Sequence, residues 1–106
     1  ASCSAPSGSA CLSTCNLSLN LGPFDVTLEN SSGSYTPFTN VAYKNVTSYA
    51  TVYPNWYQIY ISRTGSFPGN AIAAASATLE ANVSYTLYLF NAPTATEGLR
   101  AMIVSN

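Results

Sequence analysis

The sequence has very few charged side chains. Lys and Arg together number 3, Asp and Glu number 4, and 7% of the 106 residues are charged. A soluble globular domain usually has about 25% charged residues, which keep it dissolved and separate from its neighbours. Serine, threonine, asparagine and tyrosine occupy the polar positions instead. We therefore expect glycans or neighbouring copies of the chain to cover the surface.

The sequence also has no histidine, which removes most of the usual catalytic centres. No Ser-His or Cys-His pair can form. Asp25 and Glu29 lie four residues apart on one predicted strand, too far apart to pair directly as glycosidase carboxylates, and Asp25 is expected to face solvent or bond to a turn. The scattered acids do not predict a calcium site, which needs about six to eight oxygens. The sequence thus predicts no catalytic residue, metal or cofactor, and a protein that is not an enzyme.

Long hydrophobic runs and basic clusters are missing as well. The longest apolar runs, 71–77 and 85–92, are shorter than the roughly 18–20 residues that span a bilayer. Without basic clusters, nucleic acid and anionic lipid are not expected partners. No charged segment followed by an apolar one opens the chain, so we interpret Ala1 as the first residue after signal removal. These absences predict a secreted, extracellular or cell-surface protein without a membrane span.

The three cysteines lie within the first fifteen residues, and their odd number leaves one unpaired or paired with another chain. Cys11 and Cys15 are four residues apart, which in an extended strand separates them by about 13 Å, too far for a disulfide. If that segment is a strand, the partner of either within the chain is Cys3. Cys3 can form a disulfide with Cys11, with Cys15 or with a second chain, and the sequence leaves this choice open. A metal site on three thiols is not expected.

Alternation of apolar and polar residues predicts an all-β fold. Candidate strands are 11–18, 24–29, 41–43, 48–53, 56–62, 72–80, 85–90 and 99–103, with turn residues between them, including 31–34. The alanines of 71–77 favour a helix intrinsically, but the short run between strands favours a strand. Short strands at this spacing predict one immunoglobulin-like antiparallel β-sandwich of about seven strands over 11–106, preceded by a tail, 1–10, that can serve as a strand between subunits.

One corner of the predicted sandwich has a more specific pattern. Residues 79–87 read as a strand, a tight turn at Asn82, and Tyr85 opening the next strand. This pattern resembles the tyrosine corner of immunoglobulin-like sandwiches, whose hydroxyl bonds back to upstream backbone. The alternative is that Tyr85 is an ordinary core aromatic.

An ordered set of short motifs runs along the chain: Asn16-Leu17-Ser18, Gly22-Pro23-Phe24-Asp25-Val26, Asn40-Val41-Ala42-Tyr43, Tyr49, Tyr57-Gln58-Ile59, and Leu79-Glu80-Ala81 with Tyr85-Thr86-Leu87. Over roughly 12–105 this order resembles the cell-envelope β-sandwich family named domain of unknown function 4397. Lys44 stands where that family often has glycine, and Asn82 replaces the glycine of its Ala-Gly corner. The resemblance implies a bacterial or archaeal surface protein without an established enzymatic role, and supplies no catalytic residues.

Aromatic residues and sequons are the remaining candidates for function. Exposed aromatics can form a protein interface or a sugar-stacking platform, whereas the alternative is cross-strand packing in the core. The interface candidates are Tyr53, Trp56, Tyr60 and Tyr88. The candidate glycosylation acceptors are Asn30 and Asn82, at predicted turns, and Asn45 and Asn16.

The sequence therefore predicts a non-enzymatic extracellular structural subunit. We expect copies to associate through strand or edge contacts into a homopolymer, a prokaryotic surface filament or pilus. Glycans are further expected partners. The alternative function is a monomeric cell-surface module for adhesion or carbohydrate binding.

Overall fold

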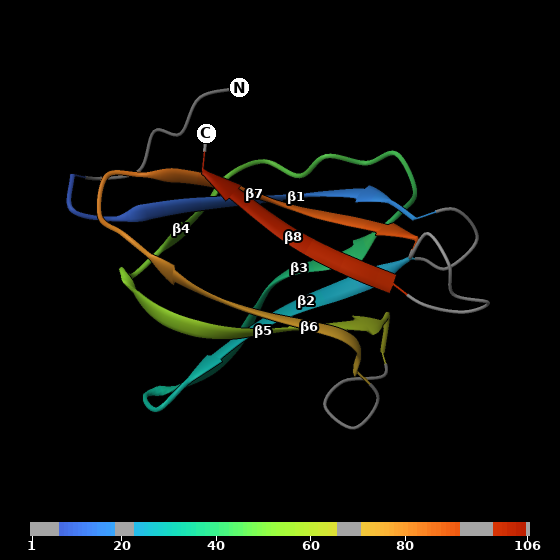
Figure 1. The fold of residues 1–106 in the computed structure, drawn as a ribbon, viewed down its shortest axis with the longest axis horizontal. Helices are drawn as coiled ribbons and strands as arrows, with labels where there is room; N and C mark the ends of the chain where they lie inside the picture. The colour runs from blue at the N-terminus through green and yellow to red at the C-terminus, as the bar shows by residue number, and fades with distance from the viewer. Residues whose placement is uncertain (1–6, 19–22, 66–70, 92–98, 106) are drawn as a thin grey trace.

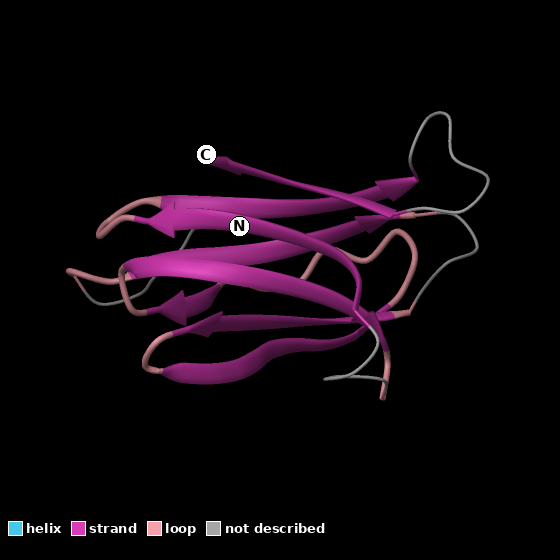
Figure 2. Cartoon of the chain, turned by 60° about the horizontal axis from the view of Figure 1, so that its bottom comes forward, coloured by secondary structure: helices cyan, strands magenta, loops and turns pink. Residues whose placement is uncertain are grey.

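The chain is an all-β sandwich, as the alternating pattern predicts. The computed structural model describes residues 7–18, 23–65, 71–91 and 99–105. Its eight strands are β1 (Ala10–Leu17), β2 (Phe24–Asn30), β3 (Gly33–Val41), β4 (Ala50–Val52), β5 (Asn55–Arg63), β6 (Ala71–Leu79), β7 (Ser84–Asn91) and β8 (Leu99–Ser105). They form two four-stranded sheets in the orders β4-β1-β7-β8 and β3-β2-β5-β6, and Figures 1 and 2 show them as two layers.

The sheets differ in how their strands pair. The sheet β3-β2-β5-β6 is antiparallel throughout, whereas β1 lies parallel to β7 and antiparallel to β4 in the other sheet. The parallel pair runs from Cys11 opposite Ser84 to Leu17 opposite Phe90. The fold therefore has eight strands where about seven were predicted, and it is mainly antiparallel, with one parallel pair.

The third strand is where the sequence prediction was wrong. A turn was expected over 31–34 and a strand over 41–43, but β3 begins at Gly33 and ends at Val41. Its polar residues and Pro37 obscure the strand pattern in the sequence, because proline is rare inside strands except at edges and bulges. β3 is an edge strand, and its register against β2 shifts twice, on either side of Val26.

The hydrophobic core lies between the two sheets and takes alternate residues from each strand. Phe24, Val26 and Leu28 of β2 are fully buried, and Leu87 and Leu89 of β7 meet them from the other sheet. The predicted alternation is thus confirmed for these strands. The segment rich in alanine is a strand, β6, and not a helix. The described residues contain no helix long and apolar enough to span a membrane.

Candidate functional site

A hollow of about 340 Å³ opens at one end of the antiparallel sheet. It lies where the turn between β2 and β3 comes close to the segment between β4 and β5. β2 and β5 bring these turns together, because Glu29 near the end of β2 pairs with Gln58 near the start of β5. We call it the tyrosine hollow. Its lining residues are Asn30, Ser32, Gly33, Ser34, Tyr35, Tyr53, Asn55 and Tyr57.

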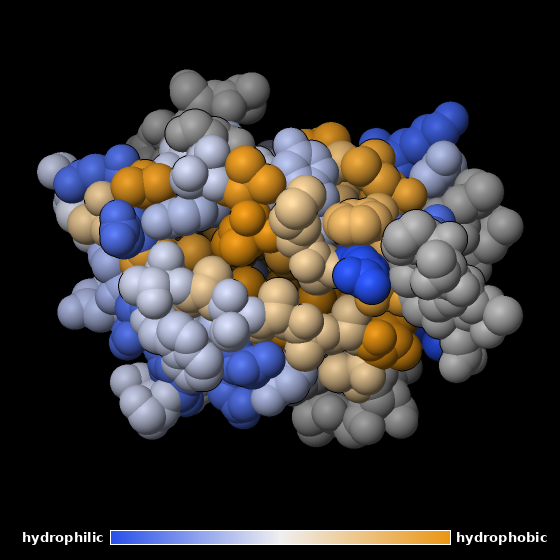
Figure 3. Space-filling view, in the orientation of Figure 1, coloured by the Kyte–Doolittle hydropathy of each residue, from blue (hydrophilic) through white to orange (hydrophobic). Residues whose placement is uncertain are grey.

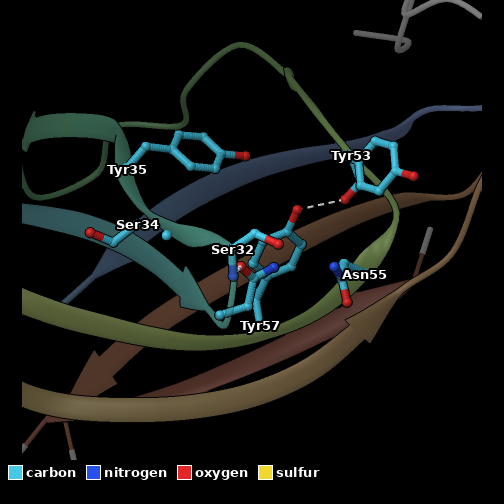
Figure 4. Close-up of a pocket in the computed structure, with 8 residues that line it drawn as sticks. Ser32, Ser34, Tyr35, Tyr53, Asn55 and Tyr57 are labelled. Atoms are coloured by element: carbon cyan, nitrogen blue, oxygen red, sulfur yellow. Dashed lines mark hydrogen bonds between the residues drawn. The ribbon is translucent and has the colours of Figure 1, made fainter.

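The three tyrosines occupy different depths in the tyrosine hollow. Tyr57 is 4% exposed and belongs to the core, whereas Tyr53 is 76% exposed. In Figure 4 the rings of Tyr35 and Tyr53 stand on opposite sides, with Tyr57 between them. The Tyr57 hydroxyl donates a hydrogen bond to the Tyr53 carbonyl oxygen at 2.6 Å. A core residue therefore anchors the exposed segment that presents Tyr53.

Burial raises the pKa of two of the tyrosines in the hollow. Desolvation by burial, with a smaller contribution from the nearby Tyr57, raises the pKa of Tyr35 from 10.0 to about 12. Burial, and secondarily Tyr53, also raises the pKa of Tyr57. None of the eight lining residues is charged. At neutral pH the hollow therefore offers hydroxyl and amide groups without formal charge.

Two asparagines fix the turns that frame the hollow. The side-chain oxygen of Asn30 accepts a hydrogen bond from the Ser32 N–H at 2.9 Å, and that of Asn55 accepts one from the Trp56 N–H at 2.7 Å. Such local bonds hold a turn in one conformation. Because the oxygen of each amide is used in the turn, the NH₂ group is what each asparagine can offer to a ligand.

The four predicted interface aromatics do not form one surface. Tyr53 lines the tyrosine hollow, but Trp56, 48% exposed, does not. Trp56 and Tyr60 alternate with the core residues of β5 and lie on the outer face of its sheet. Tyr88 lies on the outer face of the other sheet, opposite Cys15 and Met102. The single aromatic platform considered in the sequence analysis is thus divided among three places.

The interface candidates chosen from the sequence left out Tyr35 and Tyr57. They are 22 positions apart, and only the pairing of β2 with both β3 and β5 brings their strands together. The predicted turn residues 31–34 and the interface candidate Tyr53 were the signals that pointed to this end of the molecule.

A second feature is the side of the sandwich where the edge strands β6 and β8 of the two sheets lie. Each of these strands is at the edge of its sheet, and they lie next to each other. Between them the core is only partly covered; we call this strip the β6–β8 seam, and its half-buried residues are Ile72, Ala73, Ala77, Ala101 and Ile103. Figure 3 shows hydrophobic side chains across this face. Met102 and Val104, 51% and 39% exposed, extend the apolar surface on β8.

Tyr85 makes the contact that defines a tyrosine corner. Its ring is buried in the core cluster, and its hydroxyl accepts a hydrogen bond from the backbone N–H of Glu80 at 2.9 Å. The hydroxyl thus bonds to backbone five residues upstream, across the turn that joins β6 to β7. The same turn contains Asn82, whose side-chain oxygen accepts a hydrogen bond from the Gly8 N–H at 2.8 Å.

The cysteines have different environments. Cys11 is disulfide-bonded, whereas Cys15 is a free, buried thiol. Cys3 lies outside the described residues. Burial raises the pKa of Cys15 above its usual value of 9.0. A hollow of about 200 Å³ lies over this thiol, and its lining residues are Ser13, Cys15, Val46, Thr47, Tyr49, Thr86 and Tyr88. Cys15 therefore belongs to a covered part of the outer face of its sheet.

The prediction of Asn16 as a glycosylation acceptor was wrong. Asn16 has 0% exposure. Its amide nitrogen donates to the Val41 carbonyl oxygen at 2.8 Å, and its side-chain oxygen accepts from the Ser18 N–H at 2.8 Å. Both polar atoms are thus used inside the fold, and no glycan can be attached there without breaking these bonds. The other three candidates, Asn30, Asn45 and Asn82, are half-buried or exposed.

Asp25 has a structural task in place of a catalytic one. It is buried, and it accepts three hydrogen bonds: from the Asn40 N–H at 2.9 Å, the Thr64 hydroxyl at 3.1 Å and the Gly65 N–H at 3.2 Å. These donors lie at the end of β3 and in the turn after β5. Of the two expectations for Asp25, turn bonding is confirmed and solvent exposure is wrong.

The two departures from the family pattern share one backbone conformation. Lys44 has a φ of 74° and Asn82 a φ of 66°. Positive φ favours glycine because a side chain at Cβ crowds the neighbouring carbonyl. Asparagine tolerates this region better than lysine does. The glycines of the family pattern are therefore explained by backbone geometry that this chain keeps with other residues.

Comparison with known proteins supports the family resemblance that the sequence motifs indicate. No curated protein matches the chain. A family model described as Domain of unknown function (DUF4397) matches residues 10–106, from the first residue of β1 onward. Ala10, placed in the tail by the sequence analysis, is fully buried and belongs to β1. Because the match covers all eight strands of the sandwich, the chain belongs to the DUF4397 family.

Proposed function

We propose that this protein is a non-enzymatic, extracellular structural subunit that associates with copies of itself into a surface filament or pilus. The observation that carries the proposal is the β6–β8 seam, where two edge strands lie together over a partly covered core. Edge strands present unpaired backbone groups to a neighbouring strand, and natural proteins usually block them with charge, especially lysine. β6 has no charged residue and β8 has only Arg100.

The occupant of the seam is a second copy of this chain. Small side chains on β6 allow another backbone to approach closely, and Met102 and Val104 supply apolar surface beside it. The scarcity of charge on the chain removes the repulsion that would keep copies apart. The N-terminal tail, residues 1–10, is a secondary candidate for the contact between subunits. Its residues 8 and 9 are bonded to Asn82 of the same chain, which leaves 1–7 for any intersubunit role.

Placing charge at the seam tests the self-association. We expect the purified protein to form fibres or concentration-dependent oligomers in negative-stain microscopy and sedimentation velocity. The double variant Met102→Lys with Val104→Lys should lower association at least tenfold, because both side chains lie beside the edge. Val46→Lys is the matched control. Val46 is 65% exposed, but it pairs with Cys15 on β1, which β7 separates from β8. A wild-type protein that stays monomeric at all concentrations, or a double variant that assembles normally, would contradict the proposal.

The extracellular assignment is tested through the cysteines. We propose that Cys3 is the partner of Cys11, because Cys15 is free. Disulfides persist in oxidising compartments, so native material should contain one thiol per chain. That thiol, Cys15, should react with a thiol reagent only after unfolding, because it is buried and its pKa is raised. Three free thiols in native protein by mass spectrometry would place the chain in a reducing compartment instead.

Glycans are proposed at Asn45 and Asn82, where they would take the place of surface charge as solubilising groups. Asn30 lines the tyrosine hollow, so a glycan on its amide would occupy that hollow instead. Peptide mapping of native material tests each site. A glycan found at Asn16 would mean that this segment is not folded as described when the glycan is attached.

A further inference from the structure

We propose that the tyrosine hollow binds a neutral saccharide, held between the rings of Tyr53 and Tyr35 and hydrogen-bonded by the hydroxyl and amide groups around them. This is a ligand site separate from the β6–β8 seam, and it does not depend on the proposed filament.

Shape is the first argument. The hollow has a volume of about 340 Å³, at the lower end of the roughly 300–1,000 Å³ typical of ligand pockets. Three tyrosines line it, and Figure 4 shows Tyr35 on one side, Tyr53 on the other and Tyr57 between them. A pyranose ring has flat faces of C–H groups that contact aromatic rings while its hydroxyl groups point outward. The volume is therefore large enough for a short saccharide in contact with the tyrosine rings.

The chemistry of the lining is the second argument. The polar groups come from tyrosine, serine and asparagine, which donate and accept hydrogen bonds without charge. No lining side chain can neutralise a phosphate, a carboxylate or a cation. An apolar peptide would leave the hydroxyl and amide groups unpaired on burial, which is unfavourable. A neutral polyol with adjacent apolar faces satisfies both kinds of surface.

Pre-organisation is the third argument. Tyr53 is exposed, but its backbone carbonyl is fixed by the Tyr57 hydroxyl. The side chains of Asn30 and Asn55 hold the turns on either side. A site that is fixed before binding loses less conformational entropy when the ligand arrives. The raised pKa of Tyr35 keeps its hydroxyl protonated, and hence able to donate, well above neutral pH.

A titration of the full-length chain with neutral disaccharides tests this proposal. The probes are chitobiose, cellobiose, maltose and mannobiose, followed by backbone NMR shifts. We expect at least one probe to give saturable shifts at residues 30–35 and 53–57, with a Kd between about 0.1 and 10 mM. Sialyllactose and inorganic phosphate, the charged comparators, should bind at least tenfold more weakly than that probe.

Variants of the two walls locate the binding. Tyr53→Ala should weaken binding at least tenfold, because it removes a whole wall. Tyr35→Phe should weaken it about threefold, because it removes one hydroxyl and keeps the ring. Tyr43→Ala is the matched control: Tyr43 is 43% exposed, like Tyr35, but does not line the hollow. It should leave the Kd unchanged.

A second arm distinguishes the source of the saccharide. Glycopeptides released from the native chain are titrated in the same way. Binding of glycopeptides alone identifies a glycan on a neighbouring copy as the ligand, and binding of the free disaccharides identifies a soluble or cell-wall saccharide. Either result supports the proposal. Absence of shifts with both sets at about 10 mM, or binding that survives Tyr53→Ala unchanged, would overturn it.

Discussion

The hydroxyl of Tyr85 accepts a hydrogen bond from the backbone N–H of Glu80 at 2.9 Å, which locks the turn between β6 and β7 onto the core. Tyr85→Phe keeps the buried ring and removes only this bond. We expect the free energy of unfolding to fall by about 1 kcal/mol, equivalent to a decrease of about 4 °C or more in Tm.

The matched control is Tyr88→Phe, on the same strand but on the outer face. Its effect on Tm should be smaller than that of Tyr85→Phe. If Tyr85→Phe melts at the wild-type temperature, the ring alone contributes to stability and the corner bond does not.

The carboxylate of Asp25 joins the start of β2 to the end of β3 and to the turn after β5. Asp25→Ala leaves two backbone N–H groups and a hydroxyl without their acceptor. We expect unfolding in urea to show a loss of about 3 kcal/mol, since hydrogen bonds to charged groups contribute about 1.5–3 kcal/mol each and are not additive.

Glu29→Ala is the control for Asp25, because Glu29 lies on the same strand and is only half-buried. Its cost should stay below about 1 kcal/mol. Equal losses for the two variants would show that the bonds of Asp25 contribute nothing beyond ordinary packing.

Lys44 has a positive φ of 74° in the connection that follows β3. Lys44→Gly removes the crowding at Cβ, and Lys44→Ala keeps it while removing the charged side chain. We expect the glycine variant to be about 1 kcal/mol more stable than the alanine variant. Comparison of the two variants cancels the loss of the contact between the Lys44 ammonium and the Tyr43 ring. An alanine variant as stable as the glycine variant would argue that the chain relaxes out of this conformation.

The raised pKa of Tyr35 makes stability depend on pH in the alkaline range. The folded state holds the Tyr35 proton to about pH 12, whereas the unfolded state releases it near 10.0. Stability from this group is therefore complete below pH 10 and is lost as the pH rises from 10 to 12. Thermal melts across this range should show a falling Tm, and the fall should be smaller for Tyr35→Phe. Tyr43→Phe is the control, and an identical pH profile for the two variants would refute the assignment.

The strands with clean alternation could be predicted because apolar side chains recur at every second residue and face the core, as do Phe24, Val26 and Leu28. β3 could not, since its residues 33–37 are exposed or half-buried and Pro37 argues against a strand. Asn16 was misread for a related reason: a sequon is a local pattern, whereas burial of its asparagine depends on Val41, 25 positions away. The tyrosine hollow is a product of turn positions in space, which no local pattern encodes.

The parallel pairing of β1 with β7 has a consequence for the order in which the chain can fold during synthesis. Sheet β3-β2-β5-β6 is complete once residue 79 has emerged, whereas β1 has only the short strand β4 to pair with until β7, 73 positions downstream, has emerged. Contacts of such sequence separation form slowly because the loop must close first. Half of the sandwich thus lacks its central strand pair until the chain is nearly finished.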